Sequence, residues 1–395
     1  MKDKGTIAIR NLILSAIFWC GLLLALLALA AVSRTEAADT RPAPARAAGT
    51  VHYVAPGGEC GSGVNTCYDT VQSAVDAAAP GDEIRVAAGT YTDTTTLDDH
   101  SQVVYLDKSL KLRGGYTVTN WSNADPELNV TVLDAQAAPP ASSIARVLYI
   151  RGQISPTVEG FHIRGGRQEA GGGIYVRDAD LTLRTNWVEQ NYAQAGFGSA
   201  YGGGIYLRNS QARLIDNRVV DNEVGGFSAS GGGIYANGSD VTLIGNAILS
   251  NTGAVLGGGL YAYRGSIMLR SNRIEGNEAL DGGGGIYLRR MAENGPTAIL
   301  ERNAFARNLA YRGGGGYLED VDALFSGDVF SGETALTDGA ALYLDGGRAT
   351  LTNVVMVEGE ARGGADPWGE GSGLVTENCT ATLVHGTLSR NRGDS

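Results

Sequence analysis

Gly171-Gly172-Gly173-Ile174-Tyr175 is the stretch that decides the fold, because it returns along the chain at a nearly constant spacing. Close copies begin at Gly202, Gly231, Gly257 and Gly283, and weaker copies at Gly313, Gly339 and Gly371. Successive equivalents of Tyr175 are 26 to 32 residues apart. Self-similarity at such a period is typical of repeat proteins, in which each copy forms one turn of a coil.

A second motif, Leu183-x-x-Asn186-x-Val188-x-x-Asn191, follows the glycine run in the same order in each of five copies. Apolar residues alternate with polar ones through both motifs, as they do in half-buried strands, and Gly, Asn or Asp stands at each break. No repeat contains a long run at helical period. The sequence therefore predicts an all-β fold, a parallel β-helix with three short strands per turn.

The first asparagine of the second motif recurs at the same corner of successive turns. Asn tolerates left-handed backbone, and its amide can bond to the Asn of the turns above and below. We expect a buried, structural asparagine ladder that satisfies polar groups inside the coil. Its members are Asn186, Asn217, Asn246, Asn272 and Asn303.

Residues 1–38 have the pattern of an export segment. Lys2, Lys4 and Arg10 precede an apolar run over residues 12–32, and small residues follow. The segment is either a cleaved signal peptide or a retained anchor, because the run is long enough to span a bilayer. We interpret residues 39–50 as a linker. Both alternatives predict a secreted or cell-surface protein that touches the membrane only through residues 12–32, if these are not cleaved.

The spacing of two cysteines is consistent with export. Cys60 and Cys67 lie seven residues apart in a glycine-rich stretch. An oxidising compartment favours a disulfide between them, and no second Cys or His pair completes a metal site. The alternative is two free thiols in a loop.

The beginning of the coil differs from the repeats. Residues 69–79 place Val71, Ala74, Val75 and Ala78 on one helical face and end at Pro80-Gly81. An amphipathic helix here is expected to cap the open end of the coil. The domains are thus an N-terminal cap with the first turn over residues 51–100 and β-helix repeats over 101–395. The last asparagine, Asn391, is followed by no cap, so we expect the sequence to be a fragment of a longer coil or a partner to cover its end.

The stretch from Gln72 to Val86, with Ala88-Gly-Thr-Tyr91, resembles the start of secreted right-handed parallel β-helix proteins of the pectin-lyase-like superfamily. The glycine and asparagine motifs resemble repeats of the polymorphic outer-membrane-protein type. This resemblance implies the right-handed coil. It implies no single function, because this fold includes lyases, hydrolases and adhesins.

Composition excludes some classes of function. The 395 residues carry 31 Lys and Arg against 42 Asp and Glu, a net charge of −11, which argues against nucleic acid as the main partner. The four histidines are scattered and no P-loop is present, so the sequence predicts neither a metal site nor a cofactor.

Polysaccharide-cleaving members of the superfamily, as the resemblance implies, cluster carboxylates on one sheet. The chain offers Glu319, Asp320 and Asp322 as candidate catalytic residues. Such a group of acidic residues is more often a solvated face. Only if the protein is a polysaccharide lyase or glycoside hydrolase is calcium expected as a cofactor.

The tyrosines of the glycine motif form the other candidate site. If Ile174 and Val176 point inward, the tyrosine between them points outward, and its equivalents stack above it at strand spacing. An exposed aromatic ladder can stack against sugar rings or a partner protein, whereas the structural alternative is that the rings only stabilise the sheet. The candidates are Tyr175, Tyr206, Tyr235, Tyr261 and Tyr287.

The sequence therefore predicts an exported β-helix protein with a structural, adhesive or carbohydrate-binding role. Its partners would be a polysaccharide or a surface protein. No catalytic site is evident, and a polysaccharide lyase or glycoside hydrolase is the alternative.

Overall fold

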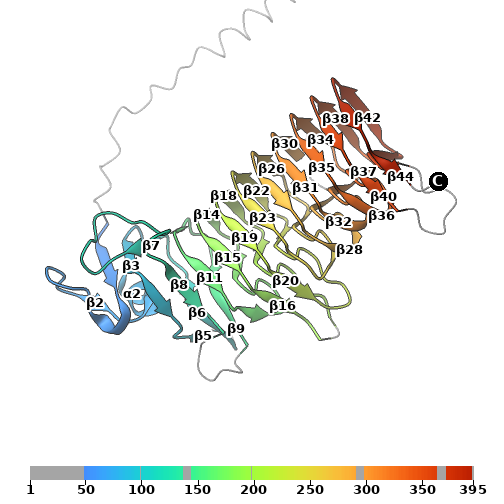
Figure 1. The fold of residues 1–395 in the computed structure, drawn as a ribbon. Helices are drawn as coiled ribbons and strands as arrows, with labels where there is room; N and C mark the ends of the chain where they lie inside the picture. Colours follow the sequence, from blue (N-terminus) through green and yellow to red (C-terminus); the bar gives the residue numbers. More distant parts are fainter. Residues whose placement is uncertain are drawn as a thin grey trace, which may run out of the picture. The chain divides into compact units, whose positions relative to one another are not determined.

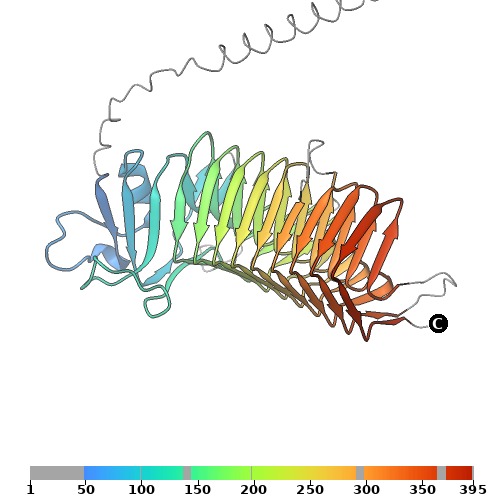
Figure 2. The same cartoon turned by 90° about the horizontal axis from the view of Figure 1, so that it is seen from above.

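The computed structural model describes residues 49–97, 99–136, 144–196, 198–290, 298–362 and 371–393. The predicted export segment and all but the end of the predicted linker lie outside these residues. The described chain is a parallel coil in which each strand pairs with its equivalent one turn further on (Figures 1 and 2). The predicted all-β parallel β-helix is confirmed.

Three long sheets run along the coil. The first has the order β2 (Cys67–Tyr68), β1 (Val51–Val54), β3 (Glu83–Ala87), β7 (Lys111–Tyr116), β10 (Thr157–Glu159), β14 (Asp180–Arg184), β18 (Gln211–Ile215), β22 (Asp240–Ile244), β26 (Ile267–Arg270), β30 (Ala298–Glu301), β34 (Ala323–Ser326), β38 (Arg348–Thr352) and β42 (Thr380–Val384). The second comprises β4 (Gly89–Tyr91), β8 (Thr131–Asp134), β11 (His162–Arg164), β15 (Trp187–Glu189), β19 (Arg218–Val220), β23 (Ala247–Leu249), β27 (Arg273–Glu275), β31 (Ala304–Ala306), β35 (Val329–Ser331), β39 (Val355–Val357) and β43 (Thr387–Ser389).

The third long sheet carries the tyrosine of each glycine motif. Its strands are β5 (Thr95–Leu97), β6 (His100–Leu106), β9 (Ala145–Arg151), β13 (Ile174–Arg177), β17 (Ile205–Arg208), β21 (Ile234–Asn237), β25 (Leu260–Tyr263), β29 (Ile286–Arg289), β33 (Gly316–Glu319), β37 (Leu342–Asp345) and β41 (Leu374–Glu377). Only β5 and β6 pair antiparallel among the described strand pairs.

A short fourth strand is present in most turns, between the second sheet and the next glycine motif. One group comprises β12 (Arg167–Gln168), β16 (Tyr192–Gln194) and β20 (Glu223–Gly225). The other comprises β24 (Ala254–Leu256), β28 (Ala279–Gly282), β32 (Leu309–Arg312), β36 (Thr334–Asp338), β40 (Glu360–Ala361) and β44 (Arg392–Gly393). The sequence predicted three strands per turn, and these short strands add to the three long sheets.

Left-handed residues make the corners between the long sheets. In the turn that contains β13, β14 and β15, Asp178, Thr185 and Gln190 have φ between 48° and 57°. One such residue turns the chain from one sheet to the next without a long loop. The inward side chains of neighbouring strands therefore meet in one core. That core is a continuous stack of Ile, Leu, Val and Phe, with Ile174, Leu183 and Val188 as examples from one turn.

The predicted N-terminal helix is present as α2 (Val71–Ala77), which follows a short 3₁₀ turn, η1 (Pro56–Gly58). Thr70 caps α2, because its hydroxyl accepts a hydrogen bond from the Ser73 amide at 3.1 Å. Val71, Ala74 and Val75 are buried, and α2 packs against β1, β3 and β6 at the start of the coil. The predicted disulfide joins Cys60 and Cys67 with Cα atoms 5.6 Å apart.

Candidate functional site

The tyrosines that the sequence singled out form a continuous stack on the third sheet. Neighbouring rings from Tyr175 to Tyr343 have centroids 4.8 to 5.4 Å apart and are nearly parallel. The expectation that these rings are exposed is wrong for most of them, since Tyr206, Tyr235, Tyr261 and Tyr287 are only 5–7% exposed. Tyr175 is half-buried. Side chains from the fourth side of the coil, among them Tyr201 and Leu256, cover the stack.

The hydroxyls of the stack are also engaged within the sheet. Tyr287 donates to a Glu319 carboxylate oxygen at 2.5 Å, and Tyr343 donates to Glu377 at 2.5 Å. Burial raises the pKa of these phenols, which keeps them as donors. The rings are direct partners in the strand register, and they stabilise the sheet as cross-strand pairs do. That they bind a ligand remains an untested prediction.

The three acidic candidates do not converge on one centre. Glu319 ends β33 and pairs with Arg289 at 2.9 Å, whereas Asp320 is a left-handed corner residue, 3.9 Å from Arg290. Asp322 pairs with Arg348 at 3.0 Å. Asp320 and Asp322 do not share a strand face, because the corner turns the chain between Glu319 and Asp322. Over the described ranges, no group of three His, Cys, Asp or Glu side chains is placed to hold a metal ion.

The asparagine ladder is present, and a second one runs beside it. In each ladder the backbone amide and the side-chain amide of one Asn donate to the Oδ1 of the Asn in the next turn, as Asn217 does to Asn246. The predicted ladder consists of Asn186, Asn217, Asn246, Asn272 and Asn303, and the second consists of Asn191, Asn222, Asn251, Asn277 and Asn308. All ten are buried. Their role is structural.

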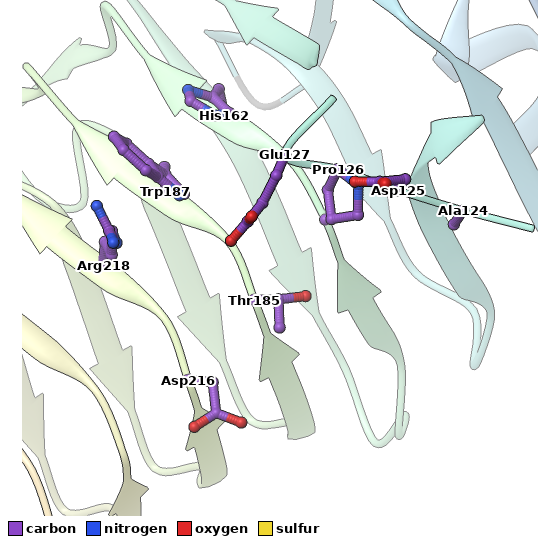
Figure 3. Close-up of a pocket in the computed structure, with 10 residues that line it drawn as sticks. Ala124, Asp125, Pro126, Glu127, His162, Thr185, Trp187, Asp216 and Arg218 are labelled. Carbon is purple, nitrogen blue, oxygen red and sulfur yellow. The ribbon is translucent and has the colours of Figure 1, made fainter. Parts of the chain in front are cut away.

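A pocket of about 450 Å³ on the second sheet is the better candidate site. Its floor is a row of the first residues of three neighbouring strands, His162, Trp187 and Arg218 (Figure 3). The His162 and Trp187 rings stack with centroids 4.8 Å apart, and the Arg218 guanidinium lies 4.4 Å from the indole centroid. The His162 ring is also held by Glu189, at 2.9 Å. Three planar groups are thus fixed side by side across the strands.

The wall of the pocket is the connection between β7 and β8, which belongs to no repeat. Pro126 packs on Gly160, where a Cβ would lie 3.2 Å from the proline Cβ, and φ is 76°. The Asp125 amide donates to the carbonyl of Gly115 at 2.7 Å, and its carboxylate accepts from the Leu128 amide at 3.1 Å. The wall is therefore held by backbone contacts that need glycine at two positions of the coil.

Charged side chains line the pocket without being paired to one another. Glu127 extends from the wall, and Asp216 stands at the corner before β19 (Figure 3). Within the residues that the structure describes, the side chains of Glu127, Asp216 and Arg218 have no hydrogen-bond or ion-pair partner. The pocket therefore presents donors and acceptors beside an aromatic edge, all available to a ligand.

Sequence reasoning did not find this pocket. Trp187 occupies the variable position of Asn186-x-Val188, where the equivalents in the next turns are Arg218 and Ala247. A large aromatic residue at an outward position was a usable signal. The wall was not predictable, because nothing in the repeat pattern places residues 124–127 over β11 and β15.

Residues 146–381 match the family described as the right-handed β-helix region, and the chain belongs to this family. The match supplies the right-handed sense of the coil. A search of the curated proteins found no match, and neither did a search of the solved structures. Among the described residues, no helix has the length and apolar character needed to cross a membrane.

Proposed function

We propose that the protein is a non-catalytic carbohydrate-binding β-helix protein and that the pocket around Trp187 is its glycan site. One observation carries the proposal: unpaired donors and acceptors line one pocket together with an indole. Sugar hydroxyls each donate and accept hydrogen bonds, and the C–H faces of sugar rings pack on aromatic groups. A volume of about 450 Å³ lies within the range of small-molecule sites.

Each lining group has a defined role in this proposal. The Arg218 guanidinium offers its N–H donors to ring or hydroxyl oxygens, since it pairs with no carboxylate of the described chain. Glu127 and Asp216 accept from hydroxyls on the opposite side. Glu189 holds the His162 ring, and the His162 ring and the Arg218 guanidinium lie over the indole, so that Trp187 presents a fixed edge.

We also propose that the protein works outside the cytoplasm, secreted or at a cell surface, with polysaccharide or a surface protein as partner. The Cys60–Cys67 disulfide supports an oxidising compartment. The acidic balance supports a function that does not involve nucleic acid. Within the β-helix family, we assign the chain to the pectin-lyase-like superfamily with repeats of the polymorphic outer-membrane-protein type.

A glycoside hydrolase is the second candidate, favoured by one observation. Glu127 and Asp216 are two unpaired carboxylates that come from different elements and line one pocket (Figure 3). Hydrolysis of a glycosidic bond needs two carboxylates on opposite sides of the bond. In this case one would act as the acid and the other as the base or nucleophile.

The test is a glycan array together with a depolymerisation assay on the purified protein. We expect binding without new reducing ends. Arg218→Ala should weaken binding about tenfold or more, because a charge-assisted hydrogen bond contributes about 1.5–3 kcal/mol. Arg273→Ala is the matched control, since Arg273 holds the same strand position two turns away and should leave binding unchanged.

Two outcomes would overturn the proposal. New reducing ends that are lost in Glu127→Gln or Asp216→Asn would replace it with the hydrolase. Equal loss of binding in the Arg218 and Arg273 variants would move the glycan site out of the pocket.

A further inference from the structure

Arg146 is a buried arginine with no counter-ion among the residues that the structure describes. It lies on β9 and is 5% exposed, and its Nε has no hydrogen-bond partner. Its guanidinium carbon lies 4.6 Å from the Tyr175 ring centroid and 5.0 Å from that of Tyr149. Over the described ranges no carboxylate pairs with Arg146.

The other partly buried arginines of the described chain differ from Arg146. Arg113 pairs with Glu159 at 3.3 Å and Arg289 pairs with Glu319 at 2.9 Å, and these carboxylates raise the pKa of both arginines. Burial lowers the pKa of Arg146, and only the two tyrosines oppose that effect. Cation–π contacts stabilise a buried cation by less than it costs to bury an unpaired ion.

A second unsatisfied group stands beside Arg146. Gln102 of β6 is paired with Arg146 in the sheet register and is fully buried. Its Nε2 donates to the Thr95 carbonyl at 3.0 Å, but its Oε1 has no partner. Buried polar groups without partners are rare in native proteins, and two on neighbouring strands need a reason.

The side chains that cover the tyrosine stack leave it most exposed at the end that contains Tyr175. Tyr175 is half-buried, whereas its neighbours Tyr149 and Tyr206 are 6% and 7% exposed. The half-buried ring lies against the Arg146 guanidinium, so the cover over the stack is thinnest directly beside the arginine.

We propose that Arg146 is an anion-binding residue and that its ligand is a carboxylate, which enters over Tyr175. A carboxylate accepts two parallel N–H bonds from the planar guanidinium, so a single small group supplies both a counter-ion and acceptors for the buried donors. Binding supplies the missing counter-ion, so it removes the penalty that the unliganded protein carries. This site lies on the third sheet, and it is independent of the pocket on the second sheet.

The test is the thermal unfolding of the purified protein in chloride, acetate, sulfate and acetamide at equal ionic strength. Acetate should raise the Tm of the wild type above its value in chloride, and this shift should be smaller in Arg146→Met. Sulfate, which is excluded from protein surfaces, should raise the Tm of both proteins equally, and neutral acetamide should raise neither. Arg146→Met should weaken the apparent acetate affinity about tenfold or more. In chloride this variant should be at least as stable as the wild type, because it removes a buried unpaired charge.

Arg312→Met is the matched control. Arg312 also lies over two rings of the stack, but it has Asp281 at 3.7 Å. Its variant should keep the acetate response. If Arg146→Met does not fold, Arg146→Lys, which keeps the charge but loses the planar fork, should show a reduced acetate response at near wild-type Tm.

Three results would overturn the proposal. A loss of stability in Arg146→Met that is equal in chloride and acetate, with the acetate shift retained, would make Arg146 a structural cap of the stack. A sulfate shift that is lost in Arg146→Met to the same extent as the acetate shift would contradict the carboxylate assignment. The absence of any acetate response in the wild type would also contradict the carboxylate assignment.

Discussion

Two carboxylates end the asparagine ladders. Asp328 takes the next position after Asn303 and accepts from its backbone and side-chain amides at 2.8 Å. Glu333 follows Asn308 and accepts from its backbone amide at 2.7 Å. The next turn has Val354 and Gly359 at these positions, which offer no side-chain acceptor. The oxygens of each carboxyl group accept from the last asparagine, so the ladder ends without an unpaired amide N–H.

Burial makes both carboxyls weak acids. It raises the pKa of Asp328 to about 6 and that of Glu333 to about 8, against the opposing hydrogen bonds from Asn303 and Asn308. The charge of Glu301 adds to the shift of Asp328, whereas Arg307 opposes that of Glu333. In the unfolded chain both lose their protons near pH 4, so between that pH and their folded pKa values the folded state holds more protons.

Stability should therefore fall as the pH rises through this window. For Glu333 the loss begins near pH 4.5 and ends near pH 8, with a slope of up to about 1.4 kcal/mol per pH unit. Glu333→Gln keeps an acceptor for Asn308 and removes the titration, so its free energy of unfolding should depend less on pH. Denaturant unfolding at pH 5, 6.5 and 8 measures the difference. The control is Glu360→Gln on the exposed face of the next turn, and identical pH profiles for wild type and Glu333→Gln would refute this account of the ladder end.

At the scale of elements, the two ladders connect successive turns from Asn186 and Asn191 to Asp328 and Glu333. Asn246 accepts from two N–H groups of Asn217, and its Nδ2 donates to the Leu214 carbonyl and to Asn272 Oδ1. Its loss leaves buried groups unpaired on both sides, which costs about 1–3 kcal/mol for each group.

Asn246→Ala should therefore lower the free energy of unfolding by roughly 3–5 kcal/mol. Chemical denaturation followed by circular dichroism gives the value. Asn65→Ala, in the exposed loop of the disulfide, is the comparison and should change stability by less than about 0.5 kcal/mol. If the two variants are equally stable, the ladder does not contribute as described.

The repeat pattern predicted most elements because each turn has the same inward apolar positions and the same corners. Inward Ile, Leu and Val and the left-handed corners are local features, so the coil and the first ladder could be predicted. The ladder ends could have been predicted as well, because Phe325-x-x-Asp328-x-Phe330-x-x-Glu333 keeps the motif with carboxylates in place of asparagines. The burial of the tyrosines depends on short strands between repeats, whose sequences vary, and it was missed.

At the scale of the molecule, the coil is a series of nearest-neighbour contacts, and irregular segments add the features that vary. The wall of the pocket, residues 124–127, is one such segment between β7 and β8. It meets the coil through Pro126 and Gly160, a contact between residues far apart in sequence that no repeat pattern encodes. A repeat pattern therefore predicts the scaffold, and the candidate site arises where the pattern is interrupted.

The central claim is that the pocket around Trp187 binds glycan. Hydrogen–deuterium exchange with and without the tightest glycan from the array tests it most directly. The account predicts slower exchange in residues 117–130 and 216–218, and no change in the fourth-side segments that cover the tyrosine stack. Slower exchange confined to those segments, or no glycan that binds at all, would contradict it.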